Sequence, residues 1–372
     1  MLRIDDGRLK AANHGRRMPL GWRFFVTVWL LSLVACTPGR SASLNVPATE
    51  SRLYVMMSTE SGWVLADADI ATGTLTPLLE GVSGFTPAPE GFVVVANGGR
   101  TLARWDGERI YTLWECAGEC RDPVLSADGK NLAWIEEKEG KYEGWVLTLA
   151  DDLATSLGAL SSRPVWNPVG DQLAAVSPEG LVLWSAVGER LASLDLPLLA
   201  AQPSWAPAGD RLAVIVPAGA AISLDPRLLA LDSEMALLQP LAADTLLAQI
   251  SELAWSPTGE QVALLRRRFF PPEETHADGD ADTYHEESSG ADALGPQPWL
   301  FAMDGGTFIP LPGDVGASFA RPVWSADGRW LAAVRLPMGI PDPRPEVWVW
   351  DVATGELLQR FPGTAAPAWG ER

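Results

Sequence analysis

The sequence predicts an all-β protein built from seven copies of a four-stranded unit, and three observations lead to this fold class. A motif centred on tryptophan recurs at intervals that match four short strands with their turns. The chain contains 35 Gly, 30 Pro and 17 Trp, a composition typical of tight turns and aromatic packing rather than of helices. Apolar residues make up 47% of the sequence, which is enough for a sizeable core.

The N-terminal segment, residues 1–35, is predicted to be a signal peptide. Arg16, Arg17 and Arg23 flank the start of an apolar run over residues 24–35, with Met18 as an alternative start. Twelve apolar residues are too few for a transmembrane helix, which needs about 20, and they suit the core of a signal peptide.

The apolar run ends in Leu33-Val34-Ala35-Cys36, which resembles the lipobox of bacterial lipoproteins. The resemblance implies that Cys36 is acylated, with palmitate or a similar chain, and becomes the mature N-terminus. An ordinary secretory signal is the alternative. Residues 36–50 are expected to form the lipidated cysteine and a flexible tether. We therefore expect an extracytoplasmic protein that is lipid-anchored to the cell membrane or outer membrane, with no other membrane contact.

Cys116 and Cys120 are the other two cysteines of the chain. Outside the cytoplasm such a closely spaced pair favours a disulfide. A metal site would need further thiol or histidine ligands nearby, and none are close in sequence.

The repeat consists of a Pro or small residue, Trp, a Ser, Asn or Ala, a Gly turn and Leu-Ala. Its central position is occupied along the chain by Phe85, Leu125, Trp166, Trp205, Trp255, Trp324 and Trp369. We interpret each copy as a β-hairpin in which Trp packs between sheets and Gly permits the tight turn. Leu-Ala then begins a return strand, in which we expect apolar and polar residues to alternate. Stacking of a ligand on the tryptophans is the alternative.

The spacing of these central positions predicts the number of units. Successive positions are 40, 41, 39, 50, 69 and 45 residues apart, and 40–45 residues is the size of one four-stranded propeller blade. The chain begins with a strand typical of the second position in a blade, at 52–57, and ends with a first strand at Trp369. Residues 51–372 are therefore predicted to form a seven-bladed β-propeller of four-stranded antiparallel blades. Its N- and C-terminal strands pair and close the ring, with six or eight blades as alternatives.

The repeat resembles that of the TolB-like propeller family, which reads roughly W-S-P-D-G-x-x-L-A. The segments at 255–259 and 324–328 match it most closely, and the resemblance covers nearly all of residues 51–372. Relatives of this family also form the propellers of prolyl-oligopeptidase-type enzymes. TolB itself has an additional α/β domain and is usually counted as six-bladed, so neither a TolB role nor a peptidase role is carried over.

One face of the propeller is expected to be elaborated. The second-to-third loops and the blade-to-blade connections share a face, and on it we place the loops over 136–144, 116–120, 217–221 and 338–345, together with a long insertion at about 269–298. The turns of the opposite face are expected to be short. Loops on a rigid scaffold commonly carry binding function, so this face is the predicted binding surface.

A second candidate site is the mouth of the central channel. Three residues before the central position of each repeat, five consecutive copies carry polar or charged side chains, namely Asp122, Arg163, Gln202, Glu252 and Arg321. These residues form a candidate site for a polar ligand. The favoured interpretation is that they pair with one another, for example Arg163 with Asp122, and simply satisfy the mouth of the channel.

The insertion at 269–298 is acidic and lacks hydrophobic periodicity, which favours a solvated segment. Asp278, Asp280 and Asp282 alternate like the start of a calcium loop, so calcium is the one cofactor considered. Thr283 replaces the expected Gly, and Ser289 replaces the expected Glu, which argues against that site. No cofactor is predicted.

Charge and motifs limit the functions. Against 47 Asp and Glu there are 28 Lys and Arg, and the net charge of −19 disfavours nucleic acid as a partner. His276 and His285, the only histidines beyond the signal peptide, lie in the insertion, and no G-x-S-x-G elbow occurs. The leading prediction is a membrane-anchored binding or scaffold module for an envelope protein, peptide or glycan. The alternatives are a purely structural envelope role and a carboxylate-based hydrolase or lyase that acts at the channel mouth on an envelope polymer or small solute.

Overall fold

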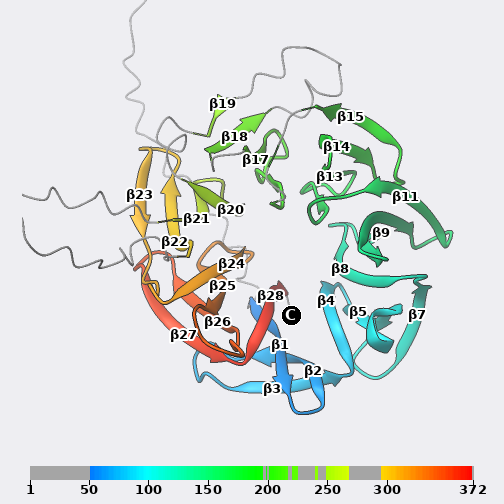
Figure 1. Ribbon diagram of the computed structural model, residues 1–372, viewed down its shortest axis with the longest axis horizontal. Helices are drawn as coiled ribbons and strands as arrows, with labels where there is room; N and C mark the ends of the chain where they lie inside the picture. Colours follow the sequence, from blue (N-terminus) through cyan, green and yellow to red (C-terminus); the bar gives the residue numbers. More distant parts are fainter. Residues whose placement is uncertain are drawn as a thin grey trace, which may run out of the picture. The chain divides into compact units, whose positions relative to one another are not determined.

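The computed structural model describes residues 51–195, 198, 201–216, 220–224, 239–241, 249–267 and 295–370. These residues form seven four-stranded antiparallel sheets, so the predicted seven-bladed architecture is confirmed (Figure 1). The signal peptide and tether predicted over residues 1–50, and nearly all of the acidic insertion, lie outside the described residues. No helix of the described residues is long and apolar enough to span a membrane.

Each blade has a first strand nearest the ring axis and a fourth strand at the outer edge (Figure 1). The first strands are β4 (Val82–Ala88), β8 (Glu119–Leu125), β12 (Val165–Trp166), β16 (Ser204–Trp205), β20 (Ile250–Trp255), β24 (Ala317–Trp324) and β28 (Thr364–Gly370). The second strands are β1 (Arg52–Thr59), β5 (Gly91–Ala96), β9 (Asn131–Lys138), β13 (Gln172–Ser177), β17 (Leu212–Val216), β21 (Gln261–Arg266) and β25 (Trp330–Pro337).

The third and fourth strands complete the blades. The third strands are β2 (Gly62–Ala68), β6 (Thr101–Trp105), β10 (Lys141–Thr148), β14 (Gly180–Ser185), β18 (Ala220–Leu224), β22 (Gln297–Ala302) and β26 (Glu346–Asp351). The fourth strands are β3 (Leu75–Glu80), β7 (Ile110–Glu115), β11 (Leu153–Ala159), β15 (Arg190–Leu194), β19 (Gln239–Pro240), β23 (Thr307–Pro310) and β27 (Glu356–Pro362). A single 3₁₀ turn, η1 (Asn97–Gly99), lies between β5 and β6. We number the blades from blade 1 (β28, β1, β2, β3) through blade 2 (β4–β7) to blade 7 (β24–β27).

The ring closes as the sequence predicts. Strand β28 pairs antiparallel with β1, with Leu53 opposite Trp369 and Tyr54 opposite Ala368. Each first strand contacts the first strand of the next blade, and β28 contacts both β24 and β4. Blade 1 is thus assembled from strands at both ends of the propeller. Every blade therefore packs against a blade on either side, and the ring is closed.

The hydrophobic core is divided among the blade interfaces. The described residues contain seven clusters of buried apolar side chains, and each cluster joins two adjacent blades. Because both faces of a blade are covered, the second strands are buried at consecutive positions, as at residues 92–95 of β5. The predicted alternation of the return strands is therefore wrong. Alternation occurs instead on outer strands such as β27.

The repeated tryptophans connect neighbouring blades by hydrogen bonds as well as by packing. The indole Nε1 of Trp166 donates to the carbonyl oxygen of Val124 on the preceding blade, at 3.1 Å. Trp205, Trp324 and Trp369 make the equivalent bond to the preceding first strand at 3.0–3.3 Å. Trp255 is the exception, because its Nε1 is buried without an acceptor among the described residues. All five tryptophans lie in, or pack against, the buried clusters between blades.

The hairpin turn of the repeat depends on its glycine. At Gly129 the φ angle is +69°, and its N–H donates to the Ser126 carbonyl oxygen at 2.8 Å. The same bond and a positive φ recur in the other four clear copies of the turn. This left-handed conformation favours glycine, so the prediction that turn geometry is what repeats is confirmed.

Two expectations about the loops are wrong. Residues 136–144 are not a long loop, because β9 and β10 extend almost to the turn at Glu139 and Gly140. Long connections are also not confined to one face. Residues 225–238 join β18 to β19, a third-to-fourth connection, and therefore link strand ends of the opposite face. We call the face with the second-to-third and blade-to-blade connections the entry face, and the other the turn face.

Candidate functional site

The five polar residues predicted at the channel mouth lie together. They line a cavity of about 520 Å³ whose wall also includes Tyr142 of the β9–β10 hairpin and Ser161 of the β11–β12 connection, so the cavity belongs to the entry face. The same five residues also line a second cavity of about 250 Å³ further along the first strands. They therefore belong to the walls of both cavities, and we call this set the polar girdle (Asp122, Arg163, Gln202, Glu252 and Arg321). We call the larger space the girdle cavity.

Backbone irregularities place the girdle side chains. The pairing register shifts in β8 between Arg121 and Val124, and in β24 between Ala320 and Val323. Asp122 and Arg321, within these bulges, have φ angles of +48° and +55°. A β-bulge re-aims a side chain, and a left-handed non-glycine residue is strained. The bulges thus re-aim the side chains of Asp122 and Arg321, both of which line the cavity.

Within the girdle, Arg321 is the residue that connects three blades. Its guanidinium lies 3.1 Å from the carboxylate of Asp122, and this ion pair joins blade 7 to blade 3 across the ring. Its backbone N–H donates to Oε2 of Glu252 on blade 6 at 2.7 Å. The suggested ion pair between Asp122 and Arg163 is not observed, because Asp122 pairs with Arg321 instead.

Arg163 is different from the other charged girdle residues. Among the described residues its guanidinium makes no hydrogen bond and no ion pair within 4.0 Å, although Asp122 and Glu252 act on it electrostatically. Burial lowers the pKa of Arg163, and the positive charge of Arg321 adds to this effect. Arginine nevertheless stays protonated in proteins. The cavity therefore contains a half-buried positive charge without a direct partner.

Glu252 is the girdle residue whose pKa is shifted in the direction opposite to that of Arg163. Burial disfavours its charged form and raises the pKa of its carboxyl group, while the hydrogen bond from the Arg321 N–H and the charges of Arg163 and Arg321 oppose this shift. A carboxyl group with a raised pKa inside a cavity is a candidate proton donor.

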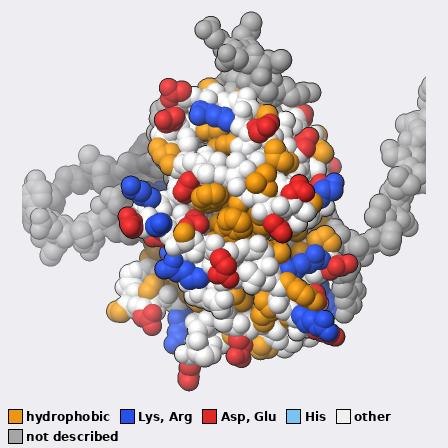
Figure 2. All heavy atoms as spheres, turned by 90° about the vertical axis from the view of Figure 1, so that its right-hand side faces the viewer, with side chains coloured by type: hydrophobic (Ala, Val, Ile, Leu, Met, Phe, Trp, Pro, Cys, Tyr) orange, Lys and Arg blue, Asp and Glu red, His pale blue; other side chains and the backbone are white. Residues whose placement is uncertain are grey.

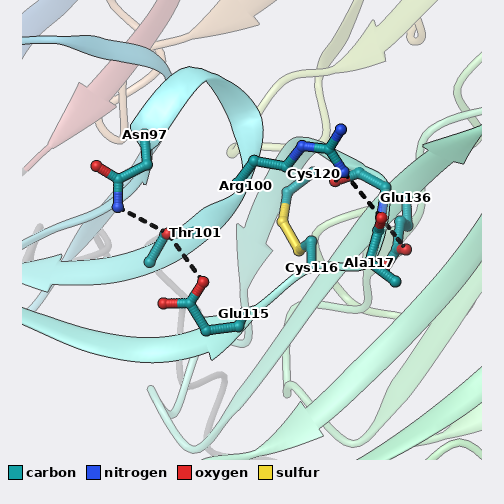
Figure 3. Close-up of a disulfide and its surroundings, with 9 residues drawn as sticks. Asn97, Arg100, Thr101, Glu115, Cys116, Ala117, Cys120 and Glu136 are labelled. Carbon is teal, nitrogen blue, oxygen red and sulfur yellow. Dashed lines mark hydrogen bonds between the residues drawn. A yellow bond between two sulfur atoms is a disulfide. The ribbon is translucent and has the colours of Figure 1, made fainter.

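The predicted disulfide between Cys116 and Cys120 is present and supports the edge of the girdle cavity. Figure 3 shows Arg100 and Glu136 approaching the loop that it closes. Arg100 donates to the carbonyl oxygen of Ala117 at 2.8 Å, and the buried Glu136 accepts from the N–H of Gly118 at 2.5 Å. The loop is therefore fixed to blades 2 and 3, and Cys120 itself lies in β8, two residues before Asp122.

Two other side chains of the cavity wall are Arg121, which the sequence analysis did not single out, and Tyr142, which lies in the segment 136–144 placed on the predicted binding face. Arg121 lies beside Asp122 and makes ion pairs with Glu119 at 3.1 Å and Glu137 at 2.7 Å. Tyr142 reaches the wall from a neighbouring hairpin and is 45% exposed. The repeat could not reveal the role of Arg121, because the equivalent residues that precede the other girdle positions and also line the cavity are uncharged, namely Ser162, Ala201, Ser251 and Ala320.

An apolar groove adjoins the girdle cavity. Its volume is about 370 Å³, and it shares Ala320 and Arg321 with the cavity. Trp63 of the β1–β2 hairpin and Leu336 of β25 line it and are 37% and 39% exposed. The entry face thus places exposed apolar side chains beside a charged cavity.

The outer side of the ring lacks such a concentration. Figure 2 shows basic, acidic and hydrophobic side chains interspersed on the side that carries β7 and β11. Exposed apolar residues there include Ile110 and Leu153 of these outer strands. Charges of one sign do not gather on this side, so it offers no counterpart to the girdle.

The weak candidate calcium ligands Asp278, Asp280 and Asp282 lie outside the described residues. Within the described residues no group of three or more His, Cys, Asp or Glu side chains is placed to hold a metal ion.

Comparisons with known proteins concern the fold. No protein-family model and no curated protein matches the chain. Among solved structures, the chain is similar to the β-propeller domain of Cps50 (Swd1) from Myceliophteria thermophila, with 12% identity, coverage of 80% of this chain and 93% of that one, and a TM-score of 0.54. It is similar to an oligogalacturonate lyase in complex with manganese, with 15% identity, coverage of 77% and 82%, and a TM-score of 0.52.

TolB from Acinetobacter baumannii also matches, with 13% identity, coverage of 86% of this chain and 82% of that one, and a TM-score of 0.47. At these identities likeness shows fold alone. The β-propeller predicted from the tryptophan repeat is confirmed, and TolB is among the propellers that match.

Proposed function

We propose that the chain is a membrane-anchored, extracytoplasmic binding module that recognises an envelope protein or peptide, with a glycan as the alternative, through its entry face. The observation that carries this proposal is that the girdle cavity and the apolar groove lie side by side and share Ala320 and Arg321 in their walls. Binding sites typically combine an apolar surface with a few convergent polar groups. A closed ring of seven blades also holds such a surface rigidly, which lowers the entropic cost of binding.

The groove residues allow a matched test of partner binding. Leu336 on the entry face and Leu358 on the outer strand of the same blade are both 39% exposed. We expect Leu336→Ser to reduce cross-linked capture of a membrane partner at least fivefold, because it removes apolar contact area from the groove. Leu358→Ser is expected to leave capture unchanged. Equal capture by both variants would show that the groove is not the binding surface.

The location rests on two features of the chain. The Leu33–Cys36 segment has the lipobox pattern, and the disulfide between Cys116 and Cys120 is typical of oxidising compartments. We expect radiolabelled palmitate to be incorporated into the full chain and lost in Cys36→Ser, with the protein shifting from the membrane to the soluble fraction. Retention of label in that variant would refute the anchor.

A second candidate function is a carboxylate-based hydrolase or lyase acting at the girdle. The raised pKa of Glu252 favours it, since a protonated carboxyl group can serve as a general acid. This candidate requires that Glu252→Gln and Asp122→Asn abolish turnover of an envelope polymer or small solute. It fails if no such substrate is turned over by the unmodified chain.

A further inference from the structure

We propose that the girdle cavity binds a carboxylate group and that the guanidinium of Arg163 receives it. This inference rests on the proposed binding function and names the chemical group that the site recognises. It follows from the charges that line the cavity, from the partners those charges already have, and from the volume that remains.

Three arginines and two carboxylates line the girdle cavity. Arg121 is neutralised locally by Glu119 and Glu137, and Arg321 is paired with Asp122. Arg163 has no ion pair within 4.0 Å among the described residues, so it is the one guanidinium of the cavity without a direct carboxylate partner. Glu252 is the remaining carboxyl group of the cavity, and burial raises its pKa, which favours its neutral form.

A single carboxylate fits that cation better than a phosphate does. Guanidinium and carboxylate groups are planar and form two parallel hydrogen bonds. Asp122 and Glu252 also line the cavity and would repel a second negative charge on the ligand. Removing a guanidinium from water is costly without a partner, and a ligand carboxylate would supply one.

The cavity also contains groups that could hold the remainder of the ligand. The side chain of Gln202 and the hydroxyl groups of Ser161 and Ser251 belong to residues of its wall. A volume of about 520 Å³ is suited to a small acid or the end of a chain. The same carboxylate chemistry occurs at the C-terminus of a peptide and in a uronic acid unit of a glycan, and the experiment distinguishes these sources.

The test is calorimetric titration of the full chain with two pairs of probes. The first pair is N-acetyl-trialanine and its C-terminal amide, and the second is glucuronate and glucuronamide. We expect at least one acid to bind at least tenfold more tightly than its amide, and the pair that shows this difference identifies the source. Equal binding of acid and amide in both pairs, absence of binding by either acid up to 10 mM (roughly the weakest range such titrations resolve), or tighter binding of inorganic phosphate would overturn the proposal.

Variants assign the effect to Arg163. We expect Arg163→Gln to weaken binding of the acid at least tenfold and Arg163→Lys to recover part of the loss, because lysine restores the charge without the planar pair of donors. Arg104→Gln, on the third strand of blade 2 and paired with Glu90, is the matched control and should leave binding unchanged. Circular dichroism and thermal unfolding establish that each variant is folded. Unaltered binding in folded Arg163→Gln would overturn the assignment.

Glu252 supplies an independent readout. The charged groups that face it are Arg163, Arg321 and Asp122, all of which line the same cavity. Deprotonation of Glu252 adds a negative charge near the bound carboxylate, so affinity should fall as the pH rises from 5 to 8. Glu252→Gln should bind more tightly at pH 8 and lose most of this dependence. An unchanged pH profile in that variant would contradict the proposed position of the ligand.

The experiments distinguish failure of the carboxylate site from failure of the proposed binding function. Capture of a protein partner that Leu336→Ser abolishes and Arg163→Gln spares would support the binding module and overturn the carboxylate site. Tight binding of a free acid without a captured protein partner would support the carboxylate site and contradict recognition of an envelope protein by the module.

Discussion

At the scale of single residues, the repeated tryptophans show what a sequence pattern does and does not contain. Their recurrence predicts packing between blades, because a large apolar side chain at a fixed place in every unit must meet a neighbour. The hydrogen bond from Trp166 to Val124 was not predicted. Its acceptor is a backbone carbonyl oxygen, and any residue provides one, so no sequence signal marks it. The sequence also does not show that the indole N–H of Trp255 lacks an acceptor among the described residues.

This hydrogen bond can be isolated by a pair of matched substitutions. Trp166 and Trp255 are 9% and 8% exposed, and only the first has an acceptor for its indole N–H among the described residues. Both Trp→Phe changes remove similar volume. We expect Trp166→Phe to lower the free energy of unfolding by about 1 kcal/mol more than Trp255→Phe, since it also loses a hydrogen bond. Urea denaturation measures the difference, and equal losses would mean that the bond contributes nothing.

The pKa of Glu252 gives a residue-scale prediction about pH. Because burial raises this pKa in the folded protein, the native state binds more protons than the unfolded chain between its ordinary value of 4.5 and the raised value. Stability must then fall as the pH increases through that interval. We expect Glu252→Gln to gain stability relative to the unmodified chain as the pH is raised from 4.5 to 8. A constant difference between the two proteins over this range would show that the pKa is not shifted.

At the scale of elements, the girdle depends on features that the repeat does not display. The sequence places polar residues at one position of five consecutive first strands, and this is sufficient to predict that they meet near the axis. It does not reveal the bulges at Asp122 and Arg321. Ala366 occupies the same position with φ +48°, so the bulge is a property of the blade architecture and not of polar residues. The partners within the girdle depend on distances across the ring and could not be predicted.

The disulfide loop is the element that most directly supports the girdle. It closes residues 116–120, and its second cysteine lies in β8, two residues before Asp122. We expect the double change Cys116→Ser and Cys120→Ser to lower the free energy of unfolding by about 2 kcal/mol, from the entropy of a short closed loop. Urea unfolding with and without a thiol reductant measures this. Reductant should destabilise the unmodified chain and leave the double variant unaffected, whereas no effect on either would contradict the role.

At the scale of the whole molecule, the sequence feature that best predicted ring closure was the incomplete blade at each end of the propeller. A chain that begins with a second strand and ends with a first strand can complete a blade only by pairing its two ends, and β28 pairs with β1 in this way. The division of the core into seven interfaces follows from that topology. The location of long connections was predicted less well, because a widened spacing between repeats does not show which turn of the blade has been lengthened.

The central claim is that partners bind at the entry face, and site-specific photo-cross-linking tests it most directly. Tyr142 lies on the entry face and Val187 on the turn face, and they are 45% and 46% exposed. A photo-reactive amino acid is placed at one position or the other in the full chain within native membranes. We predict a discrete cross-linked partner from position 142 and none from position 187. Cross-linking from position 187 alone would contradict the account, because the partner would then bind the face that lacks the girdle and groove.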